Sequence, residues 1–66
     1  MKLSVNGQTK EFPDGMSVAE LLERLKVGQG PVAVEVNLNV VPRAEHGKVI
    51  LTQGDKVEIV SFVGGG

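Results

Sequence analysis

The sequence predicts a small α+β protein, in which one main helix packs across one face of a mixed sheet of four to five strands. Several short segments alternate apolar and polar residues, as half-buried strands do. A single segment shows the spacing of an amphipathic helix, and it starts with a helix-capping sequence. Groups of Gly, Asn, Asp and Pro separate these segments and predict turns.

The first segment, MKLSVNGQTK, predicts a hairpin. Leu3 and Val5 alternate with polar residues, and the pair Asn6-Gly7 readily adopts the positive φ angles of a tight turn. We expect a second strand to return over roughly Gln8 to Phe12.

A helix is predicted to begin at Ser17. The residues from Pro13 to Gly15 interrupt the strand pattern, and Ser17 with Glu20 three residues later forms a capping box. Gly28 is the expected helix stop. Because so short a helix is marginal by itself, its apolar stripe should cover the sheet rather than form a groove for a partner. The stripe comprises Val18, Leu21, Leu22 and Leu25.

A third strand is predicted after Pro31, where VAVEVN places its valines at 32, 34 and 36 on one face. Leu38-Asn39 predicts a turn into a short strand, Val40-Val41, which Pro42 ends. An irregular stretch then leads to the apolar run at 49–51.

The last strand, Lys56 to Phe62, follows a turn at residues 53–55. Val57 and Ile59 fall on one face of this strand. Glu58, Val60 and Phe62 fall on the other face.

This order of elements suggests the β-grasp arrangement, in which the first and last strands lie side by side at the centre of the sheet. We expect one domain over residues 1–66, with residues 63–66 as a flexible tail that carries the function. A chain of 66 residues buries only about 60% of the surface that it exposes when unfolded, so a second domain is not expected.

The composition argues against several classes of function. There is no cysteine, so neither disulfides nor a thiol nucleophile are available. Seven Lys and Arg nearly balance eight Asp and Glu, and Trp and Tyr are absent, which disfavours nucleic acid as a partner. No apolar stretch is long enough to cross a bilayer. We expect a soluble, cytoplasmic protein that is a monomer when free.

The side chains do not suggest an intrinsic catalytic site, a metal site or a bound cofactor. His46 is the only histidine and lacks companions for a metal site or a triad, so we interpret it as a surface-loop residue. Asp14 and Asp55 adjoin glycines and are interpreted as turn formers. Gly28-Gln29-Gly30 follows the helix rather than preceding one, which argues against a phosphate-binding loop.

The carboxyl-terminal glycines are the main candidate site. Gly64, Gly65 and Gly66 lack Cβ atoms and can pass through a narrow channel, and an extended segment of four residues reaches roughly 13 Å. The Gly66 carboxylate is ionised at neutral pH but is a poor electrophile, so a partner holding ATP would first convert it to an acyl adenylate. A sulfur nucleophile could then displace AMP. The alternative is a frayed chain end without function.

A docking surface is predicted beside this tail. Val60 and Phe62 should point away from the helix-covered side, where Ala33 could join them, and Val63 leads into the tail. Exposed apolar clusters often mark docking surfaces. A register slip of one residue would invert the faces and remove this surface.

Taken together, these segments resemble the ThiS family, the sulfur carrier proteins of thiamin thiazole biosynthesis, which are ubiquitin-like β-grasp proteins. The resemblance spans essentially the whole chain. It is carried by VNGQ, SVAELLERL, VAVEVN, the step Val41-Pro42-Arg43, the turn Gly54-Asp55 and the end VEIVSFVGGG.

The resemblance implies that Gly66 is adenylated by a ThiF-type adenylyltransferase with MgATP and becomes a thiocarboxylate. A sulfur donor enzyme would supply the sulfur, and the thiocarboxylate would deliver it to the thiazole synthase ThiG. Gly65 and Gly66 match the family motif, with Gly64 as a permissive spacer. On this interpretation the protein is a cosubstrate and not an enzyme.

Other functions use the same features. The chain could carry sulfur for molybdopterin or cysteine synthesis. It could also be a ubiquitin-like modifier joined to lysines through Gly66, or an interaction module with an inert tail. Exposed apolar strand faces serve all of these uses.

Overall fold

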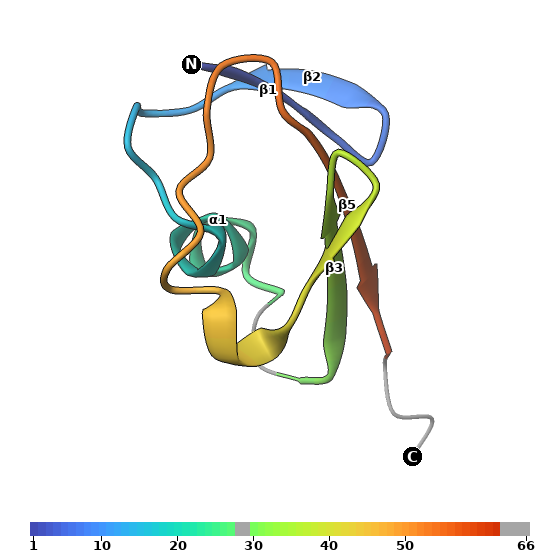
Figure 1. Cartoon of the computed structure of the whole chain (residues 1–66). Helices are drawn as coiled ribbons and strands as arrows, with labels where there is room; N and C mark the ends of the chain where they lie inside the picture. Colours follow the sequence, from blue (N-terminus) through green and yellow to red (C-terminus); the bar gives the residue numbers. More distant parts are fainter. Residues whose placement is uncertain (28–29, 63–66) are drawn as a thin grey trace.

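A computed structural model describes residues 1–27 and 30–62 of the chain. Over these residues it shows five strands, one α-helix and one short 3-10 helix (Figure 1). In chain order they are β1 (Lys2–Val5), β2 (Gln8–Glu11), α1 (Val18–Leu25), β3 (Val32–Val36), β4 (Asn39–Val41), η1 (Arg43–Glu45) and β5 (Lys56–Ser61).

The strands form one mixed sheet in the order β2-β1-β5-β3-β4. The first and last strands, β1 and β5, lie side by side at the centre and run parallel, whereas the other neighbours are antiparallel. Helix α1 lies on one side of this sheet (Figure 1). The predicted β-grasp architecture is therefore confirmed.

The core lies between the sheet and α1. The capping box at Ser17 and Glu20 is present, with hydrogen bonds of 3.1 Å in both directions. The helix stripe then meets the inward faces of the strands, as the alternation predicted. The most buried large side chains are Leu3, Val18, Leu21, Val34, Leu51 and Val57.

The helix ends earlier than predicted. Lys26 itself adopts the left-handed conformation, with φ of 61°, and terminates α1. The amides of Lys26 and Val27 donate to the carbonyls of Glu23 and Leu22, both at 3.1 Å, which closes the last turn without a glycine. The predicted stop at Gly28 is thus wrong for this helix, and Gly28 lies outside the described residues.

The turn between β3 and β4 lies one residue before its predicted position. The register pairs Val36 with Asn39, which leaves Asn37 and Leu38 as the two turn residues, with φ of 51° and 71°. Asparagine tolerates such angles, and its side chain is used here to bind β5. Ile50, in the predicted apolar run, makes only an isolated bridge with Ser17 and belongs to no strand.

The predicted tail, Val63 with Gly64, Gly65 and Gly66, also lies outside the described residues. Within the residues that are described, no helix is both long and apolar enough to cross a membrane.

Candidate functional site

The sheet face that is turned away from α1 carries the predicted docking residues. Val60 and Phe62 are 54% and 55% exposed, and Ala33, which is also exposed, lies directly opposite Val60 in the β3–β5 ladder. Val57 on the same strand is fully buried, so the register has the predicted sense. The structure thus places Ala33 beside Val60, with Phe62 two residues further along the chain. Their docking role stays a prediction, and Val63 is not described.

Two carboxylates adjoin this apolar group. Glu35 of β3 and Glu58 of β5 are directly opposite partners in the same ladder, two residues along each strand from Ala33 and Val60. Side chains at such positions share a face and have Cβ atoms about 4.5–5.5 Å apart. The alternation of β5 predicted Glu58 on this face but not its partner, because the register between β3 and β5 joins segments that are far apart in the sequence.

The end of β5 extends beyond its neighbour β1. The β1–β5 ladder pairs Val5 with Val57 and stops there. The side chain of Asn6 then continues it, because its Oδ1 accepts from the Ile59 amide at 2.7 Å and its Nδ2 donates to the Ile59 carbonyl at 3.1 Å. The Asn6 side chain therefore takes the place of one further β1 residue. It supports β5 as far as Ile59, two residues beyond Val57 in the direction of the tail.

A second asparagine holds the beginning of β5. The Oδ1 of Asn37 accepts from the Lys56 amide, and its Nδ2 donates to Asp55, both at 2.9 Å. Both asparagines occupy the first position of a two-residue hairpin turn with positive φ. The sequence predicted the turn at Asn6 but neither clamp, since a side chain's partner on a distant strand has no local sequence signal.

His46 is not the surface residue that was predicted. It is only 7% exposed, and its Nε2 lies 3.1 Å from the Val41 carbonyl oxygen. Its own carbonyl accepts from the Ala19 amide at 2.8 Å. The short helix η1 folds this loop back against α1, and the histidine is buried there as a structural hydrogen-bonding residue.

The two aspartates lie in turns, as predicted. Asp55 Oδ2 accepts from the Thr52 amide at 2.9 Å, which closes the turn before β5. Asp14 is exposed in the turn that precedes Met16. Over residues 1–27 and 30–62, no three acidic or histidine side chains come together in a way that could hold a metal ion.

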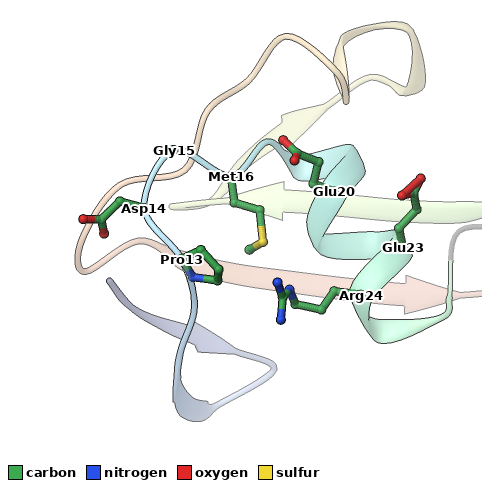
Figure 2. Close-up of a pocket in the computed structure, with 7 residues that line it drawn as sticks. All are labelled: Pro13, Asp14, Gly15, Met16, Glu20, Glu23 and Arg24. Carbon is green, nitrogen blue, oxygen red and sulfur yellow. The ribbon is translucent and has the colours of Figure 1, made fainter.

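A shallow depression of about 450 Å³ lies between α1 and the loop that precedes it (Figure 2). Its charged side chains do not converge. Figure 2 shows Asp14 pointing away from the helix, and Glu20 and Glu23 pointing to the opposite side from Arg24. Glu20 is moreover engaged in the capping box. This depression therefore does not have the arrangement of an active site.

Comparison with known proteins identifies the family. The model of the ThiS family matches residues 3–66 of the chain. The Escherichia coli sulfur carrier protein ThiS is 32% identical over 66 residues, which cover all of both chains. A crystal structure of the thiamine biosynthesis protein ThiS from Geobacter metallireducens superposes with a TM-score of 0.85 at 39% identity, again over all of both chains.

Longer proteins contain a similar segment. A thiazole synthase of Paramagnetospirillum magneticum is 47% identical over 66 residues, and one of Magnetococcus marinus is 39% identical. The chain spans only 20% of each of these two relatives. The full-length matches and the family model agree with the β-grasp fold, and the chain belongs to the ThiS family.

Proposed function

We propose that this protein is the sulfur carrier of thiamin thiazole biosynthesis and that Gly66 carries the sulfur. The observation that supports this most strongly is the family match, which continues through the glycines to residue 66. Full-length similarity to a sulfur carrier protein supports the same function. The protein would be consumed and regenerated as a cosubstrate of its partners.

The chemistry requires two steps at the Gly66 carboxyl group. In the first, a carboxylate oxygen attacks the α-phosphorus of ATP, bound with magnesium by a ThiF-type adenylyltransferase, and pyrophosphate leaves. In the second, sulfide attacks the acyl carbon and AMP leaves with one carboxyl oxygen, so that this oxygen is replaced by sulfur. The partner supplies the metal and the nucleotide, and a sulfur donor enzyme supplies the sulfur.

The fold would contribute a rigid base for the three glycines of the tail. Strand β5 has a strand on each side at Val57, paired with β1 and with β3, and Asn6 extends the support on the β1 side to Ile59. Glycines accept whatever φ angles a partner imposes, so only the last residues need to adapt on binding. Docking through Val60, Phe62 and Ala33 would deliver the tail to the partner at high effective concentration.

Thiazole synthase is the proposed sulfur acceptor. Two proteins named thiazole synthase contain a segment similar to this whole chain, which supports a working association between carrier and synthase. A carrier for molybdopterin or cysteine synthesis would use the same tail chemistry with a different acceptor.

Reconstitution tests the assignment. Purified full-length protein, ThiF-type enzyme, MgATP and a sulfide source should support product formation by thiazole synthase. Protein that lacks Gly66 should fold equally well, as judged by circular dichroism, but give no product. Sulfur transfer only to a molybdopterin or cysteine synthase would refute the pathway, and product from the shortened chain would refute the mechanism. A series of higher-mass conjugates that are joined by amide bonds and resist thiol reagents would indicate a ubiquitin-like modifier instead.

A further inference from the structure

We infer that the outward sheet face recognises an arginine on the adenylating enzyme, which Glu35 and Glu58 bind between them. This inference rests on the proposed function, because it assigns the partner of the same face. Its basis is a pair of like charges with apolar neighbours, on a face that no element of the described residues covers.

The two carboxylates are placed against each other by the sheet. Glu35 and Glu58 are directly opposite in an antiparallel ladder, where like charges destabilise the pairing. Neither forms an ion pair with any residue in 1–27 or 30–62. Lys56 lies two residues before Glu58 on the same side of β5 but does not bridge to either carboxylate. A cation from another molecule would therefore relieve a repulsion that the fold retains.

Apolar side chains lie on two sides of this pair. Ala33 and Val60 follow it toward the tail, and Val40, which is 70% exposed, lies opposite Glu35 on β4. A partner that covers them would remove water from around the carboxylates and strengthen their attraction for a cation. Arginine fits this setting better than lysine, because its planar guanidinium reaches two carboxylates at once and its stem packs on apolar surface.

The reaction indicates which partner carries the cation. An adenylating enzyme must bring an anionic carboxylate next to the phosphates of ATP, so its surface near that site needs cationic groups. Such groups attract an acidic docking face and orient it during encounter. Glu58 lies on β5, the strand that immediately precedes the tail in the chain, so the acidic pair and the tail would reach the enzyme together.

The test uses the double variant Glu35→Gln/Glu58→Gln in the full chain. Its matched control is Glu23→Gln/Glu45→Gln, which makes the same change in net charge at exposed positions away from the sheet. Affinity for the adenylating enzyme is measured by calorimetry without ATP, at low and high salt. Thiocarboxylate formation by the wild-type chain is measured separately.

We expect the sheet-face variant to bind at least tenfold more weakly, with a smaller salt dependence, while the control stays within about twofold of wild type. The sheet-face variant should also melt no lower than wild type, because it loses a repulsion. Reduced affinity together with unreduced stability separates docking from misfolding.

Unchanged affinity in the sheet-face variant would overturn this inference and leave the proposed function intact. Equal weakening in the control would also overturn it, since the effect would then be one of net charge. A third outcome would instead overturn the proposed function. In it, binding depends on the two carboxylates, but an enzyme of demonstrated activity forms no thiocarboxylate on the wild-type protein.

Discussion

The asparagine clamps on β5 allow a paired test of how the fold supports the tail. Asn6→Gly and Asn37→Gly both keep a residue that is suited to positive φ, so each hairpin turn is retained. Each variant removes two side-chain hydrogen bonds, from Ile59 in the first case and from Lys56 and Asp55 in the second. The two changes are therefore chemically alike but act at opposite ends of the strand.

The expected losses of stability are similar. Each exposed hydrogen bond contributes about 0.5–1.5 kcal/mol. The glycine adds about 0.5–1 kcal/mol through the larger entropy of the unfolded chain. Both variants should therefore lose about 1.5–4 kcal/mol of unfolding free energy in urea. A difference of more than about 1.5 kcal/mol between the two variants would contradict the prediction that they lose similar amounts of stability.

Their effects on function should differ. Without the Asn6 side chain, β5 loses its last support on the β1 side, so the Ile59 amide should exchange faster and adenylation should fall about three- to tenfold in kcat/KM. Asn37→Gly should expose the Lys56 amide to exchange instead and leave adenylation within about twofold of wild type. Equal losses of adenylation in both variants would refute a specific role for Asn6.

Two further predictions concern stability. Leu38→Gly should raise the unfolding free energy by about 0.5–1 kcal/mol, because Leu38 is 78% exposed and has φ of 71°, a strain of about 1–2 kcal/mol that glycine avoids; a lower melting temperature would contradict this. Leu21→Ala should cost about 2–5 kcal/mol, because this fully buried side chain fills the space between α1 and the sheet; a loss below about 1 kcal/mol in urea titration would show that the core had been assigned wrongly.

Local patterns predicted the elements and their faces. Alternation along β5 placed Val57 inside and Val60 outside, and the capping box at Ser17 placed the helix start. Both signals come from residues a few positions apart, and they act through local geometry. They were sufficient to predict the order of elements and, with the usual rules of connection, the β-grasp sheet.

The errors arose where distant residues determine the outcome. His46 is buried because η1 returns the loop to α1, and nothing next to His46 in the sequence indicates that contact. Lys26 ends the helix although a glycine follows shortly after, since the hydrogen bonds of the last turn offset its unfavourable φ. The pairing of Glu35 with Glu58 was missed because it depends on the register between β3 and β5, which are far apart in the sequence and share no turn.

The most direct test of the proposed sulfur-carrier function is the intact mass of the protein after incubation with the ThiF-type enzyme, MgATP and sulfide. One oxygen should be replaced by sulfur, fragmentation should place the sulfur on Gly66, and protein lacking Gly66 should be unchanged. An unchanged mass of the full-length protein, with an enzyme that modifies a known carrier in the same experiment, would contradict the central claim.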